Sequence, residues 1–124
     1  PASLTERARM DQWMSVDASY VAPHTRALAI ERILKKHEGK EPDARNVEAA
    51  ETALGHTLKV VNDALAQSPY LAGASFSLAD VSLMPYVASL PMIGADRLAA
   101  GLPHLGGWWE RVSARPSWRK VVPG

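Results

Sequence analysis

The sequence predicts an all-α fold, a single domain in which five to six helices pack around one buried central helix. Helix-start patterns lie at residues 3–6 and 76–81, and apolar side chains recur at steps of three and four along residues 47–65. No segment shows the alternation of apolar and polar residues that a half-buried strand would need. A chain of 124 residues is long enough for one such core and too short for two ordinary domains.

The composition is that of a globular protein, with 47% hydrophobic and 22% charged residues. Fourteen basic and thirteen acidic residues give a formal charge of +1, so no net field favours nucleic acid or an anionic membrane as a partner. No apolar run approaches the roughly 20 residues of a membrane span. The chain has no cysteine, which excludes disulfides and thiolate chemistry and fits a cytoplasmic location.

The first helix is expected to run from Leu4 to about Lys36. Ser3 and Glu6 have the spacing of a capping box at its start. Pro23 lacks an N–H and crowds the preceding turn, so the pattern predicts a kink or a break near Ala22.

The second helix is the most regular periodic segment. Pro42 suits a first helical position, with Asp43 beside it in the first turn. Its expected buried face is formed by Val47, Ala50, Leu54, Leu58, Val61 and Leu65. Ser68 and Pro69 end the pattern.

The third helix has the clearest start of all. Ser77 and Asp80 have capping-box spacing, with Asp80 in the place of the more usual Glu or Gln, and Phe76 and Val81 occupy the positions of a hydrophobic staple. Residues 81–90 carry no charge. A strongly capped and nearly apolar helix is the best candidate for the buried central element.

The remaining elements are shorter. Residues 96–100 fit at most a short helix between glycines, and Pro116 halts an amphipathic stripe that begins at Leu105. Trp108 and Trp109 lie in that stripe, where core packing is favoured over stacking on a base or a sugar. Residues 117–122 are expected to add a final turn.

No catalytic constellation emerges from the residues alone. The four histidines share no metal-ligand spacing, so no metal site is expected. No nucleophile elbow and no glycine-rich phosphate loop is present. Asp80 could act as a general base at the mouth of an apolar helix, but its Ser77 partner favours a structural cap. We therefore expect no catalytic residue in this chain.

Asp17 is harder to interpret. It falls near the line of Met10, Trp13, Met14 and Val21, and an acid on an apolar face needs a partner or access to solvent. Exposure at the edge of that face is the favoured interpretation, with a buried position left open.

Three segments together resemble a known family. Residues 70–81, with Tyr-Leu-Ala-Gly followed by the capped helix start, resemble the signature of the C-terminal helical domain of glutathione S-transferases. Residues 103–121 look like the end of that domain, and residues 9–17 are similar to its first helix. Residues 20–23 resemble the phi-like branch found in plants and bacteria. The resemblance covers essentially the whole chain in order.

The resemblance implies that residues 1–124 are one half of a larger enzyme. Members of the family carry an N-terminal thioredoxin-like domain that binds glutathione and holds the Ser, Tyr or Cys that activates its thiol, and no such domain is in this sequence. By resemblance, this half forms the wall of the site for small apolar electrophiles and part of a homodimer interface. Glutathione is then a co-substrate of the full-length protein, and the chain alone is expected to bind none and to be inactive.

The resemblance also suggests site residues. Ile30 and Leu34 match pocket-lining positions on the first long helix, and Tyr20, Val21 and His24 are neighbours included with them. Ser77 and Asp80 match the family's folding cap. An alternative from another class is a non-catalytic module of the kind appended to translation factors and tRNA synthetases. Nothing in the residues identifies the electrophile.

Overall fold

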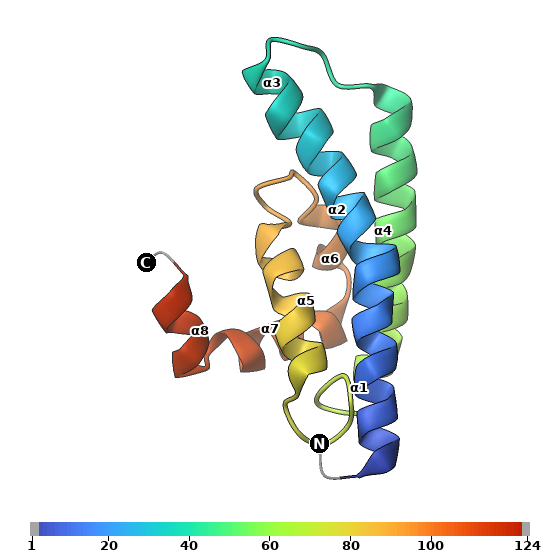
Figure 1. Ribbon diagram of the computed structural model, residues 1–124, viewed down its shortest axis with the longest axis vertical. Coiled ribbons are helices and arrows are strands. Elements are labelled where there is room, and N and C mark those ends of the chain that lie inside the picture. The colour runs from blue at the N-terminus through green and yellow to red at the C-terminus, as the bar shows by residue number, and fades with distance from the viewer. Residues whose placement is uncertain (1–2, 123–124) are drawn as a thin grey trace.

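The structure, a computed structural model, describes residues 3–122, and within this range helices are the only regular elements. Figure 1 shows two long rods lying side by side, with the shorter helices packed along them. The first rod comprises α1 (Leu4–Val16), the π-helical turn η1 (Asp17–Val21), α2 (Ala22–Ala29), the π-helical turn η2 (Ile30–Leu34) and α3 (Lys35–His37). The others are α4 (Ala44–Leu65), α5 (Leu78–Ser89), α6 (Arg97–Ala100), α7 (Pro103–Ser113) and α8 (Pro116–Val121). Counted with the first rod as one helix, the described chain has six, as the sequence predicted.

The first rod passes through Pro23 without a break. In η1 the N–H of Ala22 bonds to the carbonyl of Asp17, five residues back, and α2 then begins with Pro23 in its first turn. The wider π-helical turn accommodates a residue that an ordinary helix interior rejects. Of the predicted kink or break near Ala22, the break is wrong, and the departure from α-helical geometry at this point is the π-helical turn that ends at Val21. The rod ends at His37, and Gly39 turns the chain away with a φ of 72°.

The second rod, α4, begins at Ala44, two residues later than the sequence predicted. The Asp43 carboxylate accepts hydrogen bonds from the N–H groups of Arg45 at 2.9 Å and Asn46 at 3.2 Å. Asp43 is thus the N-cap itself, because its side chain satisfies the open donors of the first turn. Pro42 lies ahead of the cap, so its assignment to the first helical position is wrong.

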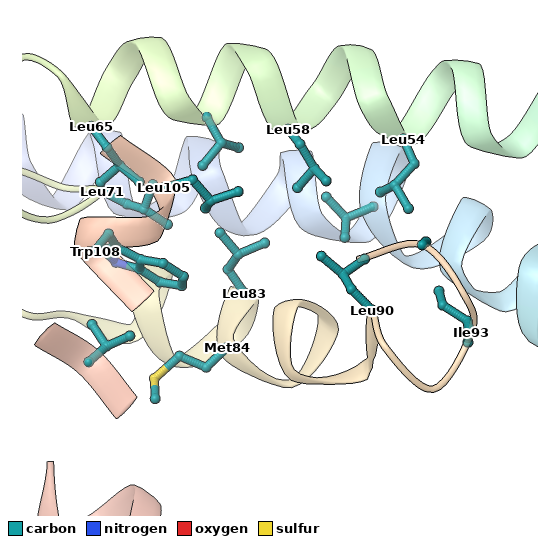
Figure 2. Close-up of a cluster of buried hydrophobic side chains, with 14 of the residues drawn as sticks. Leu54, Leu58, Leu65, Leu71, Leu83, Met84, Leu90, Ile93, Leu105 and Trp108 are labelled. Carbon is teal, nitrogen blue, oxygen red and sulfur yellow. The ribbon is translucent and has the colours of Figure 1, made fainter. Parts of the chain in front are cut away.

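The core lies between the first rod, α4, α5 and α7, and the first rod contributes Val21 and Leu28 to it. Figure 2 shows Leu54, Leu58 and Leu65 of α4 facing Leu83 and Leu90 from the chain segment that begins with α5. Trp108 of α7 is fully buried among them, which confirms that one of the two adjacent tryptophans is a core residue. Each such side chain stabilises the fold by about 1.5–3 kcal/mol through removal of its apolar surface from water.

The central helix, α5, is buried on one side only. Ala79, Asp80, Leu83 and Met84 are buried, as expected for a central element. Leu78 and Val81 on the same helix remain 57% and 46% exposed. The helix is thus central to the packing of this chain while one of its faces is open.

Candidate functional site

The capping box at the start of α5 is present and extends further than the sequence suggested. Asp80 is fully buried, and its Oδ2 accepts the N–H of Ser77 at 2.9 Å, while the Ser77 hydroxyl accepts the N–H of Ala79 at 3.2 Å. The other carboxylate oxygen of Asp80, Oδ1, accepts two more hydrogen bonds, from the N–H of Leu71 at 3.1 Å and from the indole N–H of Trp108 at 2.8 Å. The carboxylate thus binds donors from three segments of the fold, which favours the structural cap over a general base.

Phe76 and Val81 flank this cap at the staple positions. The Phe76 ring meets the Tyr70 ring edge-on at 6.1 Å, and the Arg115 guanidinium lies 3.8 Å from the Phe76 ring centre. Phe76 and Val81 both line an apolar hollow of about 330 Å³ beside α8. Trp118 and Val121 line the same hollow. The staple residues therefore form part of a surface depression as well as packing at the helix start.

Asp17 lies inside the fold with 2% of its surface exposed, so the interpretation of an exposed edge position is wrong. Neither carboxylate oxygen has a hydrogen-bond partner of normal geometry among the described residues. Burial raises the pKa of Asp17 to about 6; the nearby Ser82 side chain lowers it and the Asp80 charge raises it further. Asp17 opens η1, and the extra residue in a π-helical turn changes which side chains face inward.

Three of the five predicted pocket residues lie along a groove between the first rod and α4. Tyr20 and His24 line an open hollow of about 640 Å³, and His24 and Ile30 line a second of about 370 Å³. His24 and Ala49 line both, so the two hollows are neighbours. The structure thus brings Tyr20, His24 and Ile30 together on one surface.

The other two predicted residues lie elsewhere. Val21 is 1% exposed and packs in the core, so its side chain faces neither hollow. Leu34, the last residue of η2, is 51% exposed, and Ile30 one turn earlier is 40% exposed. Ile30 and Leu34 are thus both open to solvent in this chain.

Polar residues of α4 complete the groove, and reasoning from the sequence missed them. The first hollow is also lined by Arg45, Glu48, Ala49, Thr52, Ala53, His56 and Thr57. The signal was available within α4, because residues 45, 49, 52 and 56 recur at helical spacing beside the buried stripe. What the sequence did not show is that Tyr20 and His24 lie across from them.

Glu31, which also lines the second hollow, joins η2 to the start of α4. Its carboxylate accepts the N–H of Asp43 at 2.7 Å and the side-chain amide of Asn46 at 3.1 Å, and it pairs with Lys35 at 2.8 Å. These bonds lower the pKa of Glu31 to about 2, the Lys35 contact contributing most. Glu31 therefore acts as a clamp between the two rods.

Arg32, the next residue, holds a different neighbour. Its guanidinium donates to the carbonyls of Ile93 at 2.9 Å and Gly94 at 3.1 Å, and it pairs with Glu51 of α4. Arg97 pairs with the same carboxylate. A hollow of about 600 Å³ lies beside this cluster, but both guanidiniums are engaged by Glu51. We interpret the cluster as a structural contact that holds the turn after α5 against α4.

Two further classes of site find no support in the described residues. Across residues 3–122, no three His, Asp or Glu side chains converge as a metal site would require. None of the described helices has both the length and the apolar character to cross a bilayer.

The fold and its capped central helix define a protein class. Residues 16–116 match the family model described as glutathione S-transferase, C-terminal domain, and the chain belongs to this family. It is 34% identical to glutathione S-transferase F12 of Arabidopsis thaliana over 97% of this chain and 56% of that protein. The match to plant F-type transferases agrees with the phi-like resemblance.

Solved structures agree with this assignment. Glutathione S-transferase III in its apo form superposes with a TM-score of 0.87 at 30% identity, covering 100% of this chain and 59% of that one. Glutathione S-transferase I from maize, in complex with an atrazine glutathione conjugate, also gives 0.87, at 27% identity and covering 96% and 56%. The chain spans little more than half the length of the relatives that it matches.

Proposed function

We propose that this chain is the C-terminal half of a glutathione transferase, which joins the thiol of glutathione to small apolar electrophiles. The observation that carries the proposal is the match to the transferase domain along nearly the whole chain. One similar structure holds a glutathione conjugate of atrazine, a product of this kind of reaction. The relatives are named as transferases, which favours the enzyme over an assembly module of translation factors or tRNA synthetases.

In this proposal the two halves divide the chemistry. The thiolate of glutathione attacks an electrophilic carbon, a C–S bond forms, and the leaving group departs with the bonding electrons where the reaction is a substitution. A Ser, Tyr or Cys of an N-terminal thioredoxin-like domain lowers the pKa of that thiol. This chain supplies apolar contacts that orient the electrophile and exclude water.

Ile30 and Leu34 are the residues that we propose for this wall. They lie one turn apart and are 40% and 51% exposed, so their apolar side chains are available to a ligand. Tyr20 and His24 border the same side of the rod through the groove with α4 and are assigned a secondary part. Val21 is left out, because the core already contains its side chain.

Two further properties belong to the same proposal. We place the full-length enzyme in the cytoplasm as a homodimer, with this chain contributing part of the interface. The absence of cysteine in the chain fits a reducing compartment. Light scattering of the full-length protein and cell fractionation test these two points separately.

The proposal is tested by kinetics of the full-length enzyme with Ile30→Ala. Loss of the side chain should lower kcat/KM for an apolar aryl halide by roughly tenfold, because a few apolar carbons in a pocket contribute about 1–3 kcal/mol. KM for glutathione should stay unchanged. Val60→Ala is the matched control, since Val60 is an exposed aliphatic residue of α4 at 45% exposure.

The 124-residue chain alone is the negative control, because it is proposed to lack the thiol-activating residue. Conjugation of the aryl halide by the pure chain would contradict the proposal that the thiol-activating residue lies in the N-terminal domain. Equal kinetic effects of Ile30→Ala and Val60→Ala would contradict the assignment of the wall.

A further inference from the structure

The two residues proposed for the electrophile wall are the first and last residues of one π-helical turn. The turn η2 begins at Ile30 and ends at Leu34, and the N–H of Lys35 bonds to the carbonyl of Ile30, five residues back. Such a turn inserts one residue into an α-helix and is frequently found at functional sites. If η2 relaxed to an ordinary helix, the chain on one side of it would rotate relative to the other side by roughly 100°, the angle of one residue. The directions of Ile30 and Leu34 therefore depend on what holds this turn in place.

Glu31 holds the turn to the start of α4. It is 4% exposed, and its carboxylate accepts the N–H of Asp43 at 2.7 Å and the side-chain amide of Asn46 at 3.1 Å. Lys35, one turn later, pairs with the same carboxylate at 2.8 Å. Ile30 and Glu31 line the same hollow beside α4. The contact that fixes Glu31 is thus adjacent to a residue of the proposed wall.

Arg32 holds the same turn to a second neighbour, the turn after α5, which Figure 1 shows beside the first rod between α2 and α3. Its Nη1 donates to the carbonyls of Ile93 at 2.9 Å and Gly94 at 3.1 Å. Its Nη2 pairs with Glu51 of α4. Gly94 has a φ of 69°, in the left-handed region that favours glycine, and a Cβ there would lie 3.4 Å from Nη1 of Arg32. Ile93 is 3% exposed, so the guanidinium is attached to a segment of the core.

These contacts fix the orientation of the turn as well as its position. A guanidinium donates from a rigid planar fork, so three acceptors determine how it is oriented. Glu31 and Arg32 are consecutive residues of a five-residue turn, and they are bound to two different parts of the fold. Rotation of η2 about the axis of the rod would break both sets of bonds.

We propose that Glu31 and Arg32 are positioning residues for the electrophile, because they hold η2 in its π-helical register and thereby fix the directions of Ile30 and Leu34. In this role they act through those two side chains and need no contact with the substrate. The inference rests on the proposed function, since the wall is assigned there. It adds that the choice of electrophile depends on two charged residues as well as on the apolar wall.

The test compares Arg32→Met with Arg97→Met in the full-length enzyme. Both substitutions remove a guanidinium that pairs with Glu51, but Arg97 belongs to α6 and lies outside η2. Steady-state kinetics gives KM for an apolar aryl halide and KM for glutathione. Hydrogen exchange followed by mass spectrometry gives the protection of the amides of residues 30–35, and the amides of residues 54–65 in α4 report on the stability of the whole domain.

Arg32→Met should raise KM for the aryl halide by roughly tenfold and leave kcat and KM for glutathione unchanged, because the wall contacts are made in the ground state and the transition state alike. Amide exchange should become about tenfold faster at residues 30–35 and stay unchanged at residues 54–65. Arg97→Met should resemble the wild type in every measurement. Glu31→Gln is the second variant for the case in which Arg32→Met does not fold, and it should change the same quantities in the same direction.

Equal effects of Arg32→Met and Arg97→Met would overturn the inference, because loss of pairing with Glu51 would then explain them. Unchanged exchange at residues 30–35, or an unchanged KM for the aryl halide, would overturn it too. Ile30→Ala separates this failure from a failure of the proposed function. If Ile30→Ala lowers kcat/KM and Arg32→Met does not, only the positioning role is wrong. If Ile30→Ala has no effect, the wall itself is wrongly assigned and the inference fails with it.

Discussion

Asp80 shows how much a single buried carboxylate can organise. Its two oxygens accept three N–H bonds, from Leu71, Ser77 and Trp108, so each of these buried donors depends on the same side chain. Hydrogen bonds to an ionised acceptor are stronger than hydrogen bonds between neutral groups. When a buried N–H loses its acceptor, the folded state is destabilised by the full desolvation free energy of that N–H. The spacing of Ser77 and Asp80 revealed the cap, but not the two donors that come from other segments.

Removal of Asp80 should therefore cost more than removal of the capping hydroxyl. Asp80→Ala is expected to lower the free energy of unfolding by about 3 kcal/mol or more, since three buried donors lose a charged acceptor. Ser77→Ala should cost about 1 kcal/mol, the usual value for an N-cap. Urea denaturation of the three proteins measures both losses. Equal losses would mean that the bonds to Leu71 and Trp108 contribute little.

Asp17 makes stability depend on pH in the opposite sense to a paired carboxylate. Its pKa is about 6 in the folded chain against 3.8 for the free group, so the folded state holds the proton more tightly. The resulting stability is complete below about pH 4 and is lost as the pH rises through 6. At pH 8 the wild-type chain should lack about 3 kcal/mol that it has at pH 3.5 from this source.

Asp17→Asn should therefore flatten the dependence of unfolding free energy on pH between 4 and 8 and stabilise the chain at pH 8. Asp11→Asn, at an exposed position of α1, is the control and should leave the profile unchanged. Denaturant titrations at several pH values make the comparison. A profile for Asp17→Asn parallel to the wild type would show that the buried acid is not the cause.

At the scale of elements, the two π-helical turns are the places where the sequence pattern did not predict which side chains face the core. The positions of the helices follow from apolar spacing and caps, and the structure confirms them. The spacing assumed an ordinary helical repeat, however, and the turns η1 and η2 each depart from it. That departure is why Pro23 does not break the rod and why Asp17 faces inward.

The second π-helical turn supports a prediction about the clamp between the rods. Because the pKa of Glu31 is lowered to about 2, its contribution to stability is present above about pH 4.5 and is lost as the pH falls through 2. Glu31→Gln should thus destabilise the chain at pH 7, and the difference from wild type should shrink toward pH 2. Thermal unfolding at the two pH values tests this.

Glu38→Gln is the control for that experiment, since Glu38 is exposed and pairs only with the neighbouring Lys40 among the described residues. Its melting temperature should differ little from wild type at either pH. A deficit in Glu31→Gln that stays constant down to pH 2 would show that the charge of Glu31 is not what joins the rods.

At the scale of the whole molecule, the domain could be predicted and the groove could not. Three segments in the right order resembled one family, and the family and the six-helix arrangement are both confirmed. The groove combines Tyr20 and His24 of one rod with Arg45 and His56 of another. Such neighbours are set by the packing of two helices, and periodicity within either helix says nothing about its partner.

The bonds of Asp80 also bear on the order of folding. They span 3, 9 and 28 residues of chain, so one side chain joins a local turn to a contact that closes a long loop. Ser77 can begin the helix as soon as its own turn forms, whereas the bond to Trp108 must wait until α7 has returned to the core. Closing the loop between Asp80 and Trp108 lowers the entropy of the chain, and this loss is offset only once the bond has formed. The hydrogen bonds of the short segment that identifies the family are therefore all present only after α7 has packed onto the core. The start of the central helix is in this way coupled to the folding of the whole domain.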